Sequence, residues 1–417
     1  MTRKAPPPVD PESIEIGGRA SMIRRRRGLS LDVAAGLAGI SKPYLWQLEN
    51  GQRRFARRGL IEDLAGALGC SVIDLTGQPY QPIDRDTAEA MACLPGIRAA
   101  LHDYDADDVP DVTPRPLDEL VSWAQNANEH RDHARFSLAG RDLGTLLVES
   151  QAHALTAGGP SSARAFGALT AACMVASAVA RNVGYIDLTV AASRRGYDVA
   201  CRQDDPGLTG FARLYWAEDL MRLPAHRGAT VLTSAVDELT PAVQLGHTDD
   251  TLPAEALGMT HLVSAKIAGR EQRAADAHAH LCEAGQLAAC VGQRNGMRQH
   301  FGPTNVALWR LSIGIELGQG GRAYEDVTRS PLDVDALDSR ERSSSLHLDL
   351  ARALMQDGPD RDGEAIRHLD TADRLAPQRL RNDPIARELV ADLHRRARRR
   401  VWELDSLLNR FRMDTKG

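Results

Sequence analysis

The amino-terminal end of this 417-residue chain carries a surplus of basic side chains, the chemistry that binds a polyanion. Residues 1–80 hold twelve lysines and arginines against eight acidic residues, whereas the other 337 residues hold 39 and 48. The run Arg24 to Arg27 adds little by itself, because consecutive helical residues point in different directions and at most one or two face the same partner. Lysines are rare and number four: Lys4, Lys42, Lys266 and Lys416.

Ordinary catalytic patterns do not occur in the sequence. It has no G-x-S-x-G, P-loop or H-E-x-x-H motif, so we expect no catalytic residue, no cofactor and no enzyme activity. His278 and His280 are two residues apart and would point to opposite sides of a helix. His278 and Cys282 are four apart and could share a metal only with further ligands, so we expect no metal and interpret them as a surface histidine and a core cysteine.

Composition limits the compartment and the class of protein. The six cysteines form no C-x-x-C pair, which argues against a zinc ribbon or a disulfide framework, and we expect them to be small buried side chains. No stretch of about 18 apolar residues that could span a bilayer is found, so we expect no membrane partner. The start MTRKAPPPVDPESIE lacks the apolar run of a secretory signal, and a cytoplasmic location follows.

Five short helical segments must position the basic side chains of the first 80 residues. GGRASMIRRRRG at 17–28 predicts a helix that ends near Gly28. Ser30 is a good N-cap for a second short helix that ends at Gly39, and Ser41 caps a third, KPYLWQLENG. RRGLIEDLAGALGCSVIDL then predicts a fourth helix and a short fifth turn.

The third of these helices has one apolar and one exposed side. Leu45 and Leu48 lie three residues apart and can pack inward. The side chains left on the opposite side are those of Lys42, Pro43, Trp46 and Gln47. Pro43 is tolerated there because first-turn amides have no intrahelical partner.

Residues 17–76 resemble the Cro/repressor (XRE) type of helix-turn-helix. The resemblance lies in the motifs R-x-x-x-G-L-S, A-x-x-A-G-I-S, Y-L-x-x-L-E-N-G-x-R-R and L-A-x-A-L-G, in that order. In that family the helix that begins at the position of Ser41 enters the major groove, while the preceding helix crosses the DNA backbone. The resemblance therefore implies a head that binds double-stranded DNA.

By position, the resemblance implies contacts to base edges from Lys42, Pro43 and Gln47. Gln47 can pair bidentately with adenine, Lys42 can donate to guanine, and Pro43 offers an apolar surface, for example to a thymine methyl. Arg53 and Arg54 follow the helix end and suit phosphates. The full set expected to contact DNA is Lys42, Pro43, Tyr44, Trp46, Gln47, Arg53 and Arg54.

Four further positions of the head bear on this resemblance. Arg24 and Glu49 match residues that form an ion pair in the family, which would tie the first helix to the third and act as scaffold. Trp46 would either stack on sugar and phosphate or pack on the neighbouring domain. Leu31 stands where the family often has Gln, so one common polar contact to DNA is absent.

The rest of the chain predicts helix after helix. A hinge at 77–84 leads to a connector helix and an acidic loop at 105–116. From 117 to 413 the helical stretches pair as 163–182 with 185–201, 208–222 with 227–240, 254–268 with 271–288, 305–317 with 320–328, and 340–356 with 362–375. Ala229, Ala275, Ala323 and Ala365 mark comparable positions, spaced by 46, 48 and 42 residues.

These pairs are similar to tetratricopeptide (TPR) repeats, which implies a superhelix with a concave inner surface. The strings LSLDVAAGLAGISKPYL, LTGQPYQPIDR, FGPTNVALW and NDPIARELVADLHRRARRR resemble actinobacterial regulators that join a Cro/repressor head to a TPR-like domain. The expected fold is therefore all-α. Its parts are a disordered leader (1–16), a five-helix head (17–76), a hinge, connector and loop (77–116), a TPR-like domain (117–413) and a tail (414–417).

The resemblance implies a transcription factor, and we expect a homodimer whose repeat domain senses a peptide or small-molecule effector or docks a partner. Asn182, Asn295 and Asn305 could bind a peptide backbone if they face the concave surface, but helix capping also explains them and is the interpretation that we favour. The basic run His394 to Arg400 is interpreted as a solvated end helix rather than a second DNA contact. The rival hypothesis is a scaffold or antitoxin-like partner whose head no longer binds DNA, supported by the apolar residues Leu31 and Trp46.

Overall fold

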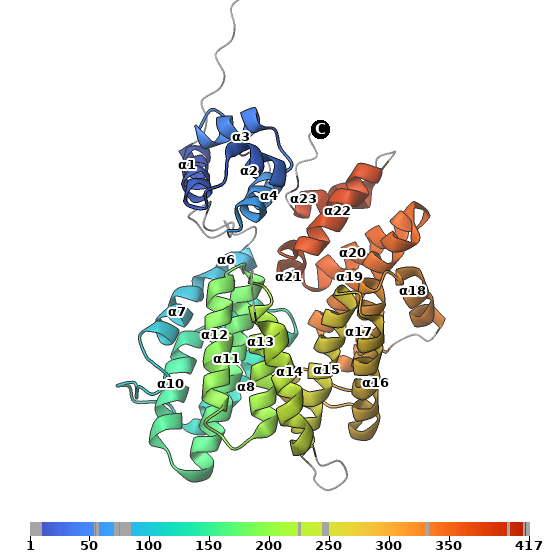
Figure 1. Cartoon of the computed structure of the whole chain (residues 1–417). Coiled ribbons are helices and arrows are strands. Elements are labelled where there is room, and N and C mark those ends of the chain that lie inside the picture. The colour runs from blue at the N-terminus through green and yellow to red at the C-terminus, as the bar shows by residue number, and fades with distance from the viewer. Residues whose placement is uncertain are drawn as a thin grey trace, which may run out of the picture. The chain divides into compact units, whose positions relative to one another are not determined.

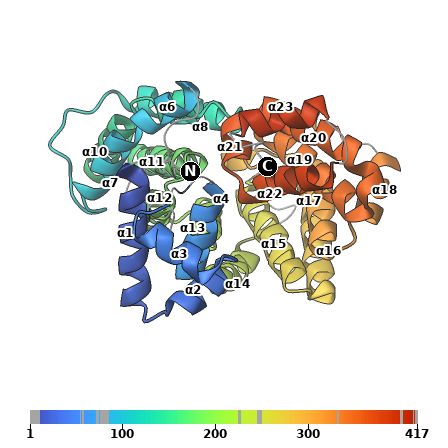
Figure 2. The same ribbon diagram turned by 90° about the horizontal axis from the view of Figure 1, so that it is seen from above.

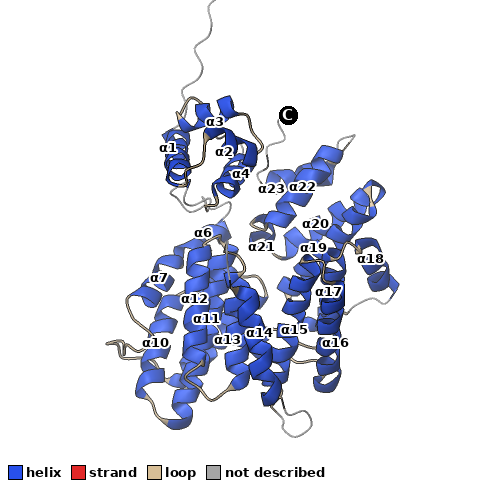
Figure 3. Ribbon diagram, viewed as in Figure 1, coloured by secondary structure: helices blue, strands red, loops and turns tan. Residues whose placement is uncertain are grey.

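A computed structural model describes residues 11–53, 55, 58–70, 75, 85–223, 227–243, 250–329, 333–397, 401–411 and 413. The chain divides into two compact units, Met1–Gln81 with Met413–Gly417, and Pro82–Arg412. In the described residues every regular element is a helix and none is a strand (Figure 3). The expected all-α fold is confirmed. The hinge at 77–84 and the tail at 414–417 lie outside the described residues.

The first unit, called the head below, contains α1 (Pro11–Arg26), α2 (Leu31–Leu37), α3 (Lys42–Glu49) and α4 (Arg58–Leu68). Helix α1 begins six residues before the expected start at 17, because Ser13 and Ile16 are buried in the head. Of the expected fifth turn only Leu75 is described, and it is fully buried in the same core. The remaining core side chains come from all four helices: Ile16, Ala20, Ala34, Ala35, Ala38, Leu45, Leu64, Ala65 and Leu68.

Two glycines set the geometry of the head. Gly39, in the turn between α2 and α3, has a φ of +65°, a left-handed conformation that glycine adopts without steric cost. Gly17 lies where α1 crosses the end of α3, and a Cβ added there would be 2.1 Å from the carbonyl oxygen of Leu48. The two helices can therefore approach backbone to backbone only with glycine at position 17.

The described residues of the second unit begin with the α-helices α6 to α14. The expected single connector is two helices, since the chain is interrupted at Cys93 between α6 and α7. The bounds are α6 (Arg85–Ala92), α7 (Leu94–His102), α8 (Leu117–Asp132), α9 (Phe136–Gly140), α10 (Leu143–Thr156), α11 (Gly159–Asn182), α12 (Ile186–Ala200), α13 (Pro206–Leu220) and α14 (Gly228–Leu239).

In the described residues the array continues with further α-helices, and short 3-10 turns lie between some of the helices. The helices are α15 (Leu252–Arg270), α16 (Ala274–Val291), α17 (Pro303–Glu316), α18 (Gly320–Arg329), α19 (Arg340–Asp357), α20 (Asp362–Leu375), α21 (Pro377–Arg381), α22 (Pro384–Arg396) and α23 (Trp402–Arg410). The turns are η1 (Thr240–Ala242), η2 (Gly296–Arg298), η3 (Asp335–Leu337) and η4 (Pro359–Arg361). All five expected helix pairs are present, and the members of each pair pack together (Figures 1 and 2).

Helix α11 is the central core element of the second unit. It is 24 residues long, and an 18-residue window has a mean hydropathy of 1.5, so by length and composition it could cross a membrane. The expectation that no such stretch exists is therefore corrected. However, 78% of that window is buried inside the protein, as in the core helix of a soluble domain. Small residues such as Ala172, Ala176 and Ala180 let the neighbouring helices pack closely around it.

The helical array curls back on itself. The side-chain amide of Asn382, just after α21, donates to the carbonyl oxygen of Asn182 at the end of α11, at 2.7 Å. Arg131 of α8 donates to Glu341 of α19, at 2.9 Å between Nη1 and Oε2. Each of these contacts joins residues that are about 200 positions apart, more than half the length of the unit. Distant parts of the sequence therefore meet at the inner surface of the array.

The cysteines differ from expectation. Cys173 is buried, Cys70 and Cys93 are half-buried, and Cys201, Cys282 and Cys290 are exposed. None of the six, all of which lie in the described residues, forms a disulfide. The prediction of uniformly buried cysteines is wrong, because three of them fall on the outward faces of surface helices and turns. Cys282 is thus an exposed residue rather than a core one, and His278 is also exposed.

Candidate functional site

The exposed side of α3 is formed as its spacing predicts. Leu45 and Leu48 are fully buried, whereas Lys42 and Pro43 are exposed. Trp46 is 45% exposed, an unusual position for such a large apolar ring. Tyr44 and Gln47 are half-buried.

Two serines precede α2 and α3. The hydroxyl of Ser30 accepts a hydrogen bond from the amide of Val33 at 3.2 Å, so it caps α2 as expected. Ser41 occupies the N-cap position of α3 with extended backbone, but its side chain makes no capping hydrogen bond. The start of α3 therefore depends on Pro43 in its first turn, with its fixed φ, and on the apolar anchors Leu45 and Leu48.

Tyr44, Gln47 and Arg53 form a cluster at the exposed side of α3. The guanidinium of Arg53 lies 6.0 Å from the centre of the Tyr44 ring, and its Nε donates to Gln47 Oε1 at 3.2 Å. This bond orients the Gln47 amide and leaves its NH2 group to donate and one Oε1 lone pair to accept. Gln47 can therefore still form the two bonds that adenine requires. Arg54 lies outside the described residues.

Lys42 lies at the start of α3 and forms an ion pair with Asp32 of α2. Its Nζ is 2.6 Å from Asp32 Oδ2, and the two side chains are 54% and 65% exposed. Such exposed pairs contribute at most about 1 kcal/mol, so a phosphate or a base edge can replace Asp32 as the partner of Lys42.

The Arg24–Glu49 pair is present and buried. Arg24 Nε and Nη2 donate to the two carboxylate oxygens of Glu49 at 2.6 and 2.7 Å, and Nη1 donates to the carbonyl of Leu29 at 3.0 Å. The hydrogen bond to Glu49 raises the pKa of Arg24. This geometry joins α1, the turn before α2 and the end of α3, which fits a scaffold role rather than a contact to bases.

Leu31 has a structural explanation for its apolar character. It is half-buried and packs against the core of the head. The polar side chain that the Cro/repressor family often has at this position is therefore replaced by a core contact.

A cavity of about 390 Å³ lies on the inner surface of the second unit and is called the basic cavity below. Among the described residues it is lined by eight basic side chains and four acidic ones. The basic side chains are Arg131, Arg181, Arg222, Lys266, Arg270, Arg342, Arg352 and Arg379, and the acidic ones are Glu218, Glu341, Asp349 and Asp383. They come from helices between α8 and α22, so only the curled array assembles this site.

Burial changes the ionisation of several groups in the basic cavity. It lowers the pKa of Lys266 and of Arg342 and raises the pKa of Glu218, because each loses water around its charged form. Burial also opposes the charge of Glu341, but the surrounding guanidinium groups, first among them Arg131, outweigh it and lower the pKa of that carboxyl group. The guanidinium groups thus favour a negative charge at the position of Glu341, whereas burial disfavours the charge of Glu218.

Of the three candidate asparagines, only Asn305 lines the basic cavity. It is fully buried, and its Nδ2 donates to the carbonyl of Gln299 at 3.2 Å. Asn182 Nδ2 instead donates to the carbonyl of Ala178 one turn earlier in α11, at 2.8 Å. Asn295 is exposed, and its Oδ1 accepts from the amide of His300 at 3.2 Å. The structure therefore does not bring the three together, because the last two satisfy local backbone groups.

Sequence reasoning missed the residues that line this cavity beside Asn305. They include Lys266, Trp309, Ser312 and Arg342. One signal was available for Lys266, since it is one of four lysines among 51 basic residues and follows the apolar stretch HLVSA. No comparable local signal marks the others.

The amino-terminal match covers the head. Residues 15–75 match the family model described as a helix-turn-helix domain. A search of curated proteins found no match. The chain therefore has a helix-turn-helix domain at its amino terminus, and α2 and α3 are its two central helices.

A comparison with solved structures found distant similarity to the following two proteins, among others. PlcR of Bacillus thuringiensis, in complex with the peptide PapR7 and DNA, is 12% identical with a TM-score of 0.27, covering 66% of this chain and 95% of that chain. The competence regulator ComR of Streptococcus vestibularis, in its apo form, is 12% identical with a TM-score of 0.29, covering 91% and 97%.

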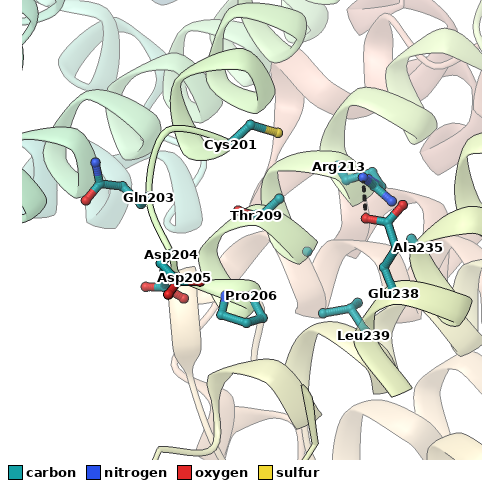
Figure 4. Close-up of a pocket in the computed structure, with 11 residues that line it drawn as sticks. Cys201, Gln203, Asp204, Asp205, Pro206, Thr209, Arg213, Ala235, Glu238 and Leu239 are labelled. Atoms are coloured by element: carbon teal, nitrogen blue, oxygen red, sulfur yellow. Dashed lines mark ion pairs between the residues drawn. The ribbon is translucent and has the colours of Figure 1, made fainter. Parts of the chain in front are cut away.

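A second, smaller cavity of about 310 Å³ lies between α13, α14 and the turn before α13. Figure 4 shows Asp204 and Asp205 at one edge and an ion pair between Arg213 and Glu238 at the other. Arg213 is 2.7 Å from the carboxylate of Glu238 and also donates to the hydroxyl of Tyr197 at 2.7 Å. Its charge is already satisfied, so the described lining of this cavity offers no free cation to a ligand.

Asp132, His300 and Ser339 form a hydrogen-bonded group in the second unit. The aspartate lies between the serine and the histidine, which is not the arrangement that nucleophilic catalysis requires. His300 Nε2 and Ser339 Oγ both contact Asp132, each at 2.6 Å. Ser339 also accepts from the amide of Arg342 and so caps α19. The serine is not next to the histidine that would have to activate it, so these residues form a structural network. Among the described residues no three His, Cys, Asp or Glu side chains gather at a metal-binding distance.

Proposed function

We propose that this protein is a sequence-specific, DNA-binding transcriptional regulator whose helix α3 enters the major groove. The observation that carries the proposal is the two-sided build of α3 within the matched helix-turn-helix domain. Leu45 and Leu48 anchor it, while Lys42, Gln47 and Arg53 face outward. Lys42 and Gln47 supply base contacts, and Arg53 supplies a phosphate contact.

We also propose that the protein acts in the cytoplasm as a homodimer, not as an enzyme, and that its helical unit dimerises and senses an effector or docks a partner. A single head contacts too few base pairs for useful selectivity, and two-fold pairing doubles that contact. The basic cavity supports the sensing role, since it is lined by helices from α8 to α22. An occupant that favours one arrangement of these helices would shift the protein toward it.

The experiment is DNA selection from a random duplex library, followed by fluorescence anisotropy with the selected site and a scrambled duplex. The same titrations include the region upstream of the protein's own gene. We expect the selected site to bind at least about 10³-fold more tightly than the scrambled one at physiological salt. Equal affinity for both duplexes would instead favour a scaffold or an antitoxin-like partner. Support for that rival now depends on Trp46, since Leu31 is part of the core.

A further inference from the structure

We propose that the basic cavity binds a small anionic molecule, a phosphate or carboxylate compound that also carries an N–H or O–H donor. Lys266 and Arg342 would neutralise its charge, and Ser312 and Asn305 would hydrogen-bond to it. This inference deepens the proposed sensing role and rests on it only in naming the occupant as the effector.

Six of the eight basic side chains already have acidic partners. Arg131 pairs with Glu341, Arg352 with Glu316 and Asp349, and Arg270 with Glu316. Arg181 and Arg222 pair with Asp219, and Arg379 with Glu341. These pairs are internal to the protein and explain most of the charge. No carboxylate of the described residues forms an ion pair with the remaining two, Lys266 and Arg342.

Lys266 and Arg342 are the free cations of the cavity. The ammonium of Lys266 lies 5.5 Å from the centre of the Trp309 ring, a cation–π contact that positions it without neutralising it. Arg342 Nη2 donates to the carbonyl of Gln299 at 3.3 Å, which leaves most of its five N–H donors for another acceptor. Taking an unpaired charge out of water is unfavourable, so an anion that joins them would be bound strongly.

Two buried polar atoms at the wall of the cavity have no hydrogen-bond partner. They are Ser312 Oγ and Asn305 Oδ1, in side chains that are 5% and 0% exposed. Almost all buried polar groups in proteins are hydrogen-bonded, so each of these atoms indicates a missing partner. Ser312 can donate to an anion, whereas Asn305 Oδ1 can only accept and therefore requires a donor on the ligand.

The size of the cavity favours a small molecule. Its 390 Å³ is at the low end of the range of about 300–1,000 Å³ that small-molecule sites occupy. Trp309, Leu308 and Met259 supply apolar surface beside the charged groups. The combination of a few apolar contacts with converging polar groups is typical of a site that orients one compact ligand.

The test uses the full-length protein without DNA, with pyrophosphate as the phosphate probe and citrate as the carboxylate probe. Acetyl-trialanine amide serves as an uncharged peptide probe. Isothermal calorimetry and thermal unfolding should show saturable binding of at least one anion at millimolar concentration and a higher Tm. The anion that binds more tightly identifies the charged group of the effector. We expect the uncharged peptide not to bind.

The variants are Lys266→Met and Arg342→Met, with Arg310→Met as the matched control. Arg310 follows Trp309 in α17 but is exposed and does not line the cavity. Each cavity variant should weaken anion binding by about tenfold or more, whereas the control should leave it unchanged. Lys266→Met removes a buried charge that has no acidic partner, so the ligand-free protein should keep or raise its Tm.

Three results would overturn the inference. They are no saturable binding of either anion, equal weakening by Arg310→Met, or uncharged-peptide binding as tight as that of the anions. Operator affinity is measured separately on the same preparations. Normal operator binding without anion binding contradicts only the inference, whereas anion binding at Lys266 without any specific DNA binding contradicts only the proposed function.

Discussion

Gln47 is the side chain that we expect to contribute most to distinguishing one DNA sequence from another. We expect Gln47→Ala to lower specific binding by about 1–3 kcal/mol and to leave non-specific binding intact, because it removes contacts to a base and no positive charge. Arg53→Ala should weaken both kinds of binding, since Arg53 is charged and also holds Gln47 Oε1.

Anisotropy titrations with operator and scrambled duplexes measure both effects. They need one fixed salt concentration, since phosphate contacts make affinity salt-dependent. A Gln47→Ala protein that still discriminates its site as wild type does would show that another element contacts the bases.

Two ion pairs of the described head residues, Arg24–Glu49 and Lys42–Asp32, should differ in their contribution to stability. Arg24 is 7% exposed and Glu49's side chain 3%, so Arg24→Ala leaves a buried carboxylate and should destabilise the head by about 3–5 kcal/mol. Lys42→Ala breaks an exposed pair and should cost at most about 1 kcal/mol. Hydrogen–deuterium exchange of α1 and α3 in the full-length protein provides the comparison. Similar exchange in both variants would contradict the scaffold role of Arg24.

At the scale of elements, the crossing of α1 and α3 can be tested with two adjacent glycines. Gly17→Ala would place a Cβ 2.1 Å from the carbonyl oxygen of Leu48, so the helices must separate, at a cost of about 1–3 kcal/mol. Gly18 is exposed on the same helix with nothing within 4 Å, and Gly18→Ala should stabilise α1 by about 0.5–1 kcal/mol.

Relative to wild type, Gly17→Ala should therefore show faster exchange in α1 and weaker operator binding. Gly18→Ala should show slower exchange in α1 and tighter operator binding. If Gly17→Ala behaves like Gly18→Ala, the close approach of α1 to α3 is not what sets the position of α3.

Two helix pairs of the second unit each contain a pair of histidines. His261 and His280 join α15 to α16 with their Nδ1 atoms 2.9 Å apart, and His347 and His368 join α19 to α20 at 2.8 Å. One ring nitrogen must donate and the other accept, so the contact requires an unprotonated ring. Burial lowers the pKa of His261 to about 4 and that of His368 to about 4.

These histidines predict a loss of stability in acid. A folded pKa below the unfolded value of about 6.5 means that the stabilisation is complete above that pH and is lost as the pH falls toward 4. Urea unfolding of the second unit should therefore become easier between about pH 7 and pH 5. His261→Gln should reduce this pH dependence, and the exposed His278→Gln should not. An equal slope in wild type and His261→Gln would exclude the pair as its cause.

At the scale of the whole molecule, selectivity for DNA requires two heads. We expect a homodimer on a near-palindromic operator, with half-site centres about 10 base pairs apart or a multiple of that distance. We place the dimer contact in the helical unit, because it is much the larger of the two units. Light scattering of the free protein and of its operator complex gives the mass. Monomers in both states would contradict the prediction.

Local sequence rules were enough to predict the short helices of the head and the helix pairs, whereas the helix-turn-helix domain was predicted from the resemblance of the motifs in residues 17–76. Helix caps, glycine stops and apolar spacing act over a few residues, so Ser30, Gly39, Leu45 and Leu48 could be placed from the sequence alone. The five helix pairs followed from the same short-range pattern. The start of α1 was misplaced, since the burial of Ile16 depends on the rest of the head.

Only the tertiary structure decided which residues meet at the basic cavity. Its lining extends from Arg131 to Ile385, and no periodicity within one helix specifies how far the array curls. That curvature brings Lys266, Ser312 and Arg342 together and leaves Asn182 and Asn295 outside. Sequence spacing determines each helix and its apolar face, because those depend on neighbours within a turn or two. The cavity depends on packing between helices far apart in the chain, which spacing does not encode.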